Sequence, residues 1–483
     1  MRRALAGLGA LVLVAAGYLT ADAFDVVPGV LTIDRTPATA GMPSLPTVTP
    51  GASPSPTVTP VPVPSVAASA SPLTAAGPTA ALPTAAGVAA ALARAVVAAG
   101  LGSSVGVTVR DASTGAHLLD ISADSPRTPA STVKLLTAAA ITTSLAPDLT
   151  FATRAVRGAG AHDVILVAGG DTLLSPGEGT ASAVAGRAGL ADLARQTARA
   201  LTAQAVSSVR LHIDERYAFG DRYARGWLPV DIRAGLTGGV AMLGLSTQRP
   251  APGSPASTDP ALSTARAFAR ALTAEGLAVA SVIDRKASSA RAAELGVVRS
   301  APVAEVLGLA LDESDDALTE SLARQAAVKA GRGTSFAAVT AWVTDALVAK
   351  GVDMLGVTMI DTSGLSRGSL VPARVLGDVL ALAAAGRYPA LQDVVAQLPV
   401  AGLSGTLADR FVRGSDHAAA GLARAKTGTL TGVSALAGTV VDKDGRLLTF
   451  ALLADNVAPG VGTLNARAAL DRFVATLARC GCG

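Results

Sequence analysis

Ser131 and Lys134 lie three residues apart at the start of an alanine-rich apolar stretch, STVKLLTAAA. Residues three apart on a helix share a face, so the lysine amine would lie against the serine hydroxyl. A serine hydroxyl is a weak nucleophile at neutral pH and needs an adjacent base. A desolvated lysine can lose its proton, whereas an arginine cannot. Because the chain has only 6 lysines against 34 arginines, lysine at this position indicates a chemical requirement.

A second lysine opens the motif Lys426-Thr427-Gly428, in the stretch ARAKTGTLTG that leads into a predicted strand hairpin. Because Gly428 has no side chain, a substrate backbone could approach this strand closely and pair with its edge. Lys426 could bind a carboxylate and keep a neighbouring amine unprotonated. Each short motif also fits a plain structural interpretation, an N-cap serine with a surface lysine or an ordinary hairpin entry.

A third motif, Ser314-Asp315-Asp316, lies between the other two on a predicted helical segment. The three in this order resemble the signature S-x-x-K, S-D-N, K-T-G of penicillin-binding proteins and β-lactamases. The interval of 183 residues between Ser131 and Ser314 is similar to that of the class C low-molecular-weight penicillin-binding proteins, the D-alanyl-D-alanine carboxypeptidase/endopeptidase family. The resemblance extends from about residue 84 to 477 and also rests on GGDTLLS, DTSGLSRGSLVPARVL and LPVAGLSGTL.

The resemblance implies a role for each residue that matches a motif. Ser131 would attack the carbonyl of the penultimate D-Ala and become acylated, and Lys134 would take its proton. Ser314 would relay a proton to the leaving amine, while Lys426 and Thr427 would hold the terminal carboxylate. Water would then release the enzyme, and neither a metal nor another cofactor is implied.

Further residues are implied to bind substrate. The backbone N–H groups of Ser131 and Thr429 would form the oxyanion hole. Asp361, Ser363, Gly364 and Leu365 lie in a stretch that borders the active site in the family, where Leu365 would wall the substrate; a purely structural loop is the alternative interpretation. Asp316 stands where the family has asparagine. A carboxylate between the two lysines would favour the charged form of both, so we expect a working but slowed enzyme.

The order of predicted elements indicates an α/β fold with an inserted part. A helix and a hairpin open the folded region, and a hairpin and a helix close it, so strands from both ends could pair in one antiparallel sheet between helices. The resemblance implies the same transpeptidase-like, β-lactamase-like domain. We expect it to comprise residues 83–150 and 301–478, with smaller inserted domain or domains at 151–300.

The N-terminal region is typical of an exported protein. Arg2 and Arg3 precede an uncharged apolar run, so residues 1–23 are predicted to be a signal peptide or a signal-anchor, with cleavage and retention both open. Residues 24–82 are predicted to be a linker rich in Pro, Ser, Thr and Ala, which cannot form a core. At the other end, residues 479–483 with Cys480 and Cys482 are expected to be a free tail.

Composition limits the partners. The net charge of +4 is small and spread along the chain, which argues against a nucleic-acid partner. The resemblance implies peptidoglycan stem peptides as substrate and β-lactams as covalent inhibitors, acting at an extracytoplasmic site with membrane contact only through the N-terminal segment. Two alternatives stay open: a β-lactamase or esterase with the same nucleophile, and a wall-associated scaffold that has lost turnover.

Overall fold

The computed structural model describes residues 80–412 and 414–483. The predicted signal segment at 1–23 and nearly all of the predicted linker at 24–82 lie outside the described residues. Within the described part of the chain, no helix combines the length and the apolar character that a membrane span requires.

Strands from the two ends of the described chain pair in one antiparallel sheet of five strands, in the order β11-β12-β13-β1-β2. Val105 of β1 pairs with Ala454 of β13, so a strand from near each end of the described chain lies in the middle of this sheet. Every residue of β13, LLTFALLA, is buried, as expected for a central strand covered on both faces. The strands are β1 (Val105–Asp111), β2 (His117–Ile121), β11 (Ala423–Leu430), β12 (Val433–Val441) and β13 (Leu447–Ala454).

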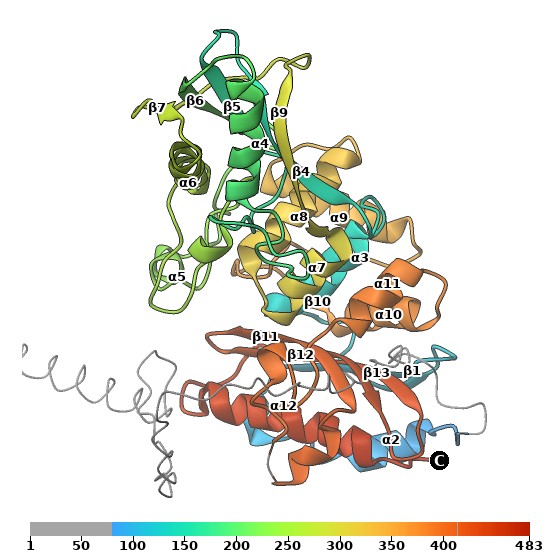
Figure 1. Cartoon of the computed structure of the whole chain (residues 1–483). Coiled ribbons are helices and arrows are strands. Elements are labelled where there is room, and N and C mark those ends of the chain that lie inside the picture. Colours follow the sequence, from blue (N-terminus) through green and yellow to red (C-terminus); the bar gives the residue numbers. More distant parts are fainter. Residues whose placement is uncertain (1–79, 413) are drawn as a thin grey trace, which may run out of the picture. The chain divides into compact units, whose positions relative to one another are not determined.

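Helices cover both faces of this sheet (Figure 1). The closing helix α12 (Gly462–Arg479) packs on β12, and α2 (Ala85–Leu92) packs on β2 and α12. The ring of Phe473 on α12 lies 6.3 Å from that of Phe450 on β13, in the core beneath the sheet. On the opposite face, α10 (Ala373–Ala384) packs on β1 and β13.

A helical layer continues from that opposite face. Its centre is α3 (Lys134–Ile141), in which all eight residues are buried, so the helix is enclosed on every side. The helix packs against α8, α9, α10 and α11. The bounds of the surrounding helices are α7 (Val303–Asp312), α8 (Asp316–Lys329), α9 (Phe336–Val348) and α11 (Pro389–Ala396).

A second sheet, of six strands, is built entirely from residues between 150 and 302 and has its own hydrophobic core. Its pairing is mixed, since β4 pairs antiparallel with β5 and β9, whereas β6 pairs parallel with β5, β7 and β8. Its elements are β4 (Thr150–Arg157), β5 (Asp163–Val167), α4 (Leu190–Thr202), β6 (Ser208–Asp214), α5 (Pro229–Arg233), α6 (Pro260–Ala274), β7 (Ala278–Val279), β8 (Asp284–Arg285) and β9 (Glu294–Pro302). Two further strands, β3 (Pro126–Arg127) and β10 (Val371–Pro372), pair with each other.

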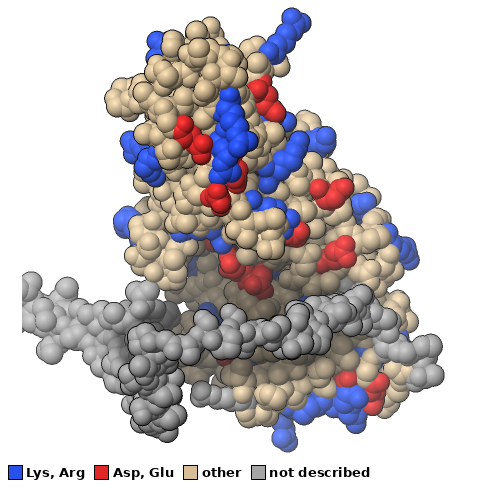
Figure 2. Space-filling model, in the orientation of Figure 1, with Lys and Arg blue, Asp and Glu red and all other residues tan. Residues whose placement is uncertain are grey.

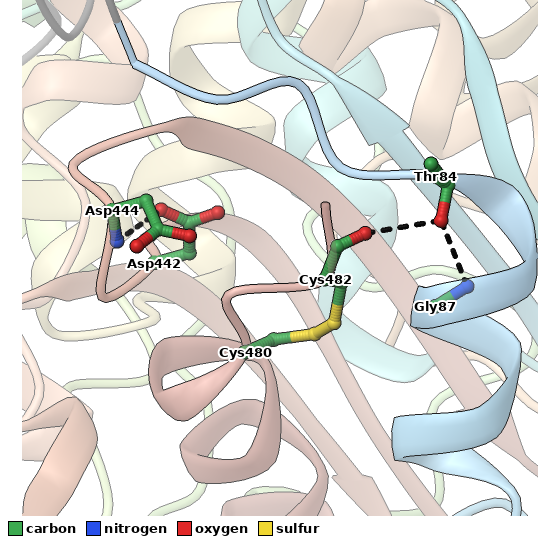
Figure 3. Close-up of a disulfide and its surroundings, with 6 residues drawn as sticks. All are labelled: Thr84, Gly87, Asp442, Asp444, Cys480 and Cys482. Atoms are coloured by element: carbon green, nitrogen blue, oxygen red, sulfur yellow. Dashed lines mark hydrogen bonds between the residues drawn. A yellow bond between two sulfur atoms is a disulfide. The ribbon is translucent and has the colours of Figure 1, made fainter.

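The expectation of a free C-terminal tail is wrong. Cys480 is only 5% exposed and forms a disulfide with Cys482. The carbonyl of Cys482 accepts hydrogen bonds from the backbone N–H of Thr84 at 2.6 Å and from its hydroxyl at 3.1 Å (Figure 3). The same hydroxyl accepts from Gly87 N at 3.0 Å and so caps α2. The tail therefore fixes the start of the first described helix.

Candidate active site

Ser131 and Lys134 meet where a short 3₁₀ helix, Ala130–Val133, runs directly into α3. Lys134 Nζ donates a hydrogen bond to Ser131 Oγ at 3.0 Å, the contact that the three-residue spacing predicts. Ser131 is partly exposed, whereas Lys134 is completely buried. The serine is thus reachable from solvent, while the lysine is reachable only through it.

The turn that presents Ser131 is held between two glycines. Ala130 has a left-handed backbone, with φ 46°. A Cβ on Gly364 would lie 2.0 Å from Ala130 O, and a Cβ on Gly428 would lie 2.6 Å from Pro129 O. Both separations are far below van der Waals contact, so two chain segments can press on this turn only because both residues are glycine. The structure therefore gives Gly428 a packing role beneath the nucleophile rather than the substrate-facing role expected from the sequence.

The buried ammonium of Lys134 has an acceptor for each of its three protons. Besides Ser131 Oγ, these are the carboxylate of Asp316 and the backbone carbonyl of Ser363, at 2.7 Å. One of these three contacts, the one with Asp316, is also an ion pair. In this arrangement the lysine donates to the serine, and it must give up a proton before it can accept one.

Asp316 is the first residue of α8 and is 7% exposed. Burial raises the pKa of its carboxyl to about 6, although Lys134 acts in the opposite direction. The carboxylate is therefore ionised at neutral pH. Within the described residues it forms a hydrogen bond and an ion pair with Lys134 and no hydrogen bond with Lys426, although its charge raises the pKa of Lys426.

Lys426 does not reach the accessible face of β11. Its side chain is completely buried, and its Nζ donates to the carbonyl of Thr427 at 3.1 Å. Burial, reinforced by the charge of Lys134, brings the pKa of Lys426 well below its usual value, and Asp316 and Asp312 offset this only in part. The structure therefore does not place this side chain on the cavity wall, and its role in holding a substrate carboxylate stays a prediction.

The alternation of side chains along β11 explains this difference. Residues two apart in a strand share a face, so Lys426 and Gly428 point inward while Thr427 and Thr429 point outward. These two threonines line a cavity of about 360 Å³ that also contains Ser131 and Ser314. Ser314 lies in the turn between α7 and α8 with a left-handed backbone, φ 59°. The structure thus brings together four of the predicted residues around one opening.

The backbone of β11 is also available to this cavity, because β11 is the edge strand of the sheet. On the outer edge, Ala423 O and Ala425 N bond to the segment 399–401. Backbone groups alternate between the two edges of a strand, so the N–H and C=O groups of Thr427 and Thr429 also point to this outer edge of the sheet. Within the described residues no other backbone group covers them. The N–H of Thr429 is therefore free to bind a substrate oxygen.

The segment from Asp361 to Ser366 is fixed by two buried carboxyl groups. Asp361 accepts hydrogen bonds from Gly364 N at 2.6 Å, from Ser366 N at 2.7 Å and from the Trp227 indole at 2.7 Å. Glu320 accepts from the N–H groups of Thr362 and Ser363, both at 2.7 Å. These contacts orient the Ser363 carbonyl that binds Lys134.

Leu365 lies in the same segment but away from the cavity. It is 7% exposed and packs in the core of the inserted region with Trp227. The expectation that it walls the substrate therefore does not fit its position.

Three cavity-lining residues were not predicted from the sequence. Thr406, Arg410 and Arg467 line the same opening as Ser131. Thr406 bonds through its hydroxyl to the hydroxyl of Thr427 at 3.0 Å. The stretch LPVAGLSGTL, which was singled out above, contains Thr406 and ends three residues before Arg410, whereas no sequence pattern distinguishes Arg467 among the many arginines of the chain.

Comparison with known proteins identifies the class. The model of the D-Ala-D-Ala carboxypeptidase 3 (S13) family matches residues 88–249 and 236–477, and the chain belongs to this family. Carboxypeptidase DacB of Mycolicibacterium smegmatis is 38% identical over 78% of this chain and 80% of its own length. A carboxypeptidase of Mycobacterium tuberculosis is 37% identical over 81% of this chain and 84% of its own length. Membership confirms the serine peptidase class, a hydrolase, that the three motifs indicate.

The fold has solved relatives. The crystal structure of penicillin binding protein 4 from Haemophilus influenzae superposes with a TM-score of 0.65 at 20% identity, over 81% of this chain and 98% of that one. A second structure of the same protein, complexed with a β-lactam, covers the same shares with a TM-score of 0.58. These similarities confirm the predicted fold class.

Glu320 provides a test of how the Ser363 carbonyl is held. Burial, with the charge of Asp361, raises the pKa of Glu320 to about 8, so it is protonated at neutral pH. The folded protein then keeps a proton that the unfolded chain loses above its ordinary pKa of 4.5. Stability should fall as pH rises from about 4.5 to 8, by at most about 1.4 kcal/mol per pH unit from this group.

Glu320→Gln should preserve stability near pH 7 and make this slope shallower, because the amide can accept from the two N–H groups and donate to Thr362 Oγ1. Part of the slope should stay, because burial also raises the pKa of Asp316 and of Asp171. Urea unfolding at several pH values between 4.5 and 8.5 measures this difference. Glu275→Gln, an exposed position, is the matched control and should retain the slope. A Glu320→Gln variant with the wild-type slope would contradict the assignment.

Proposed function

We propose that the protein cleaves the terminal D-Ala from peptidoglycan stem peptides through an acyl-enzyme on Ser131. The observation that carries this proposal is the hydrogen bond from the completely buried Lys134 to the cavity-facing hydroxyl of Ser131. Within the described part of the chain, the cavity contains no histidine that could act as the base in its place.

The proposed reaction uses groups that surround the cavity. Lys134, once neutral, takes the proton of Ser131 as Oγ bonds to the carbonyl carbon of the penultimate D-Ala. The N–H groups of Ser131 and Thr429 stabilise the oxyanion, where one donor is worth about 10²- to 10³-fold in rate. The C–N bond then breaks, and the proton passes through Ser314 to the leaving amine. Water finally hydrolyses the ester.

Lys426 has a different role in this proposal from the one that the motif suggests. Burial lowers its pKa and its side chain does not line the cavity, so in this proposal another group binds the terminal carboxylate. Its amine instead holds the Thr427 carbonyl. In this way it fixes the outward direction of the two threonines that face substrate.

β-lactams are proposed to acylate the same serine, and the proposal extends to the organisation of the chain. A relative of the same fold has been crystallised with a β-lactam. We also propose that residues 83–150 and 301–478 form the catalytic domain around the insertion at 151–300. The N-terminal segment would deliver the enzyme to an extracytoplasmic site.

Ser131→Ala should abolish covalent labelling by a fluorescent penicillin and cleavage of a D-Ala-D-Ala peptide, since the variant lacks the nucleophile. Gel fluorescence and mass spectrometry of the labelled peptide measure this loss. Ser281→Ala, at an exposed position of the insertion, is the control and should behave as wild type. An adduct on any residue other than Ser131 would disprove the mechanism. Rapid release of the penicillin would favour a β-lactamase, and labelling without peptide cleavage would favour the scaffold alternative.

Asp316→Asn should raise the acylation rate. The ionised carboxylate stabilises protonated Lys134, and an uncharged amide does so less. A free-energy change of about 1 to 3 kcal/mol for one altered buried contact corresponds to roughly 5- to 150-fold in rate.

The measurement is the second-order acylation constant of both proteins between pH 5 and 10. Asp315→Asn, which changes the adjacent helix cap rather than the lysine contact, is the control for general effects on α8. If the wild-type protein is acylated as fast as the Asp316→Asn variant at every pH, the claim that this carboxylate slows the enzyme is wrong.

A further inference from the structure

The cavity around Ser131 has a wall that the proposed reaction does not yet use. Arg410, which follows a 3₁₀ turn at Gly405–Leu407, and Arg467, on α12, line it together with Thr427 and Thr429. The arginines lie 57 residues apart in sequence and belong to different elements. The fold thus brings two guanidinium groups to the same opening as the nucleophile.

Only one of these two charges is balanced. Arg410 binds Asp471 through Nε at 3.0 Å and Nη2 at 2.5 Å, and both side chains are largely buried. Arg467 makes no side-chain hydrogen bond or ion pair with any described residue. Burial and the neighbouring charge of Arg410 lower the pKa of Arg467, and Asp471 offsets this only in part. The carboxylate of Asp471 thus offsets the positive charges of two partly buried side chains, Arg410 and Arg467.

Arg324 and Arg424 are buried or half-buried and also have no ion pair among the described residues, but each donates to a backbone carbonyl, which Arg467 does not. Many arginines of the insertion are ion-paired, among them Arg154, Arg195 and Arg285. On the face shown in Figure 2, blue and red side chains are interspersed over much of the surface. A half-buried cation without a partner costs free energy. Its position at a catalytic opening points to an anion that comes from the substrate.

The proposed substrate supplies one such anion next to the scissile bond, the carboxylate of the terminal D-Ala. The lysine expected to bind it, Lys426, is completely buried and does not line the cavity, and burial lowers its pKa. The outward hydroxyls of Thr427 and Thr429 can donate hydrogen bonds but carry no charge. Among the described residues that line the cavity, Arg467 is the cation that has no carboxylate partner.

We propose that Arg467 binds the terminal carboxylate of the peptide, with Thr427 and Thr429 as its uncharged partners and Arg410 as a second positive charge held in place by Asp471. This inference rests on the proposed function and names the residue that selects a free C-terminus. An arginine suits this task, because its guanidinium stays charged and can bind both oxygens of a carboxylate.

The test compares two N-acylated peptides that end in D-Ala-D-Ala, one with a free carboxylate and one with a C-terminal amide. Wild type should prefer the free acid. Arg467→Gln should lower kcat/KM for the acid by about 10- to 100-fold and leave the amide nearly unchanged, because only the acid loses a charged hydrogen bond. Arg467→Lys should retain part of the preference.

Two controls separate binding from structure. Arg472→Gln changes an exposed arginine of the same helix and should retain the full preference for the acid. The melting temperature of Arg467→Gln should be equal to or above that of wild type, because the variant removes an unbalanced charge. A merely structural arginine would instead lower the melting temperature and reduce cleavage of both peptides equally.

The outcomes are distinguishable. If wild type cleaves the acid and Arg467→Gln keeps the full preference for acid over amide, this inference is wrong while the proposed function stands. If wild type cleaves neither peptide, the proposed function fails, and the carboxylate site fails with it. A selective loss on the acid that spares the amide supports both.

Discussion

The structure of the site depends on one buried ammonium group. Lys134 lies at the start of a helix that is enclosed on all sides, where a charge without partners would be very unfavourable. Its three acceptors come from distant parts of the sequence: the Ser131 turn, the first residue of α8 and the carbonyl of Ser363. Each must be placed accurately for the charge to be tolerated. The packing of this region therefore places the three hydrogen-bond acceptors of Lys134.

That requirement explains features that otherwise look unrelated. Gly364 and Gly428 allow two segments to press on the turn that carries Ser131. Glu320 and Asp361, both buried, direct their oxygens at backbone N–H groups of the segment that contains Ser363. Trp227 links Asp361 to the inserted region. The insertion thus contributes to holding the reactive pair, although its own core is separate.

Two buried lysines share this site, and the structure treats them differently. Asp316 gives Lys134 a counter-charge, whereas the one hydrogen-bond partner of the Lys426 amine among the described residues is a backbone carbonyl. Lys134 therefore has a counter-ion in the site, whereas burial lowers the pKa of Lys426. An asparagine in place of Asp316 would remove that distinction, which makes this position the point where the chain can adjust the basicity of Lys134.

Much of this could be predicted from the sequence because it is local or periodic. The Ser131–Lys134 contact follows from helical spacing, and the sheet that unites both chain ends follows from the hairpins near each end. The errors concern interactions between distant segments. Alternation shows that Lys426 and Thr427 face opposite ways, but only the packing of β11 decides which side is open. The position of Leu365 in the inserted core, the anchoring of Cys482 on Thr84 and the arrival of Arg467 at the cavity are likewise set by tertiary contacts.

The central claim is that Lys134 exchanges a proton with Ser131 rather than only supplying charge. The most direct measurement is the second-order rate constant for acylation by a penicillin in Lys134→Arg and Lys134→Ala, with Lys329→Arg at an exposed position as control. Circular dichroism would establish that each variant is folded. The account predicts that arginine is nearly as damaging as alanine, each costing about 10²- to 10⁴-fold, because a guanidinium does not give up its proton. A folded Lys134→Arg variant that keeps most of the wild-type rate would contradict it.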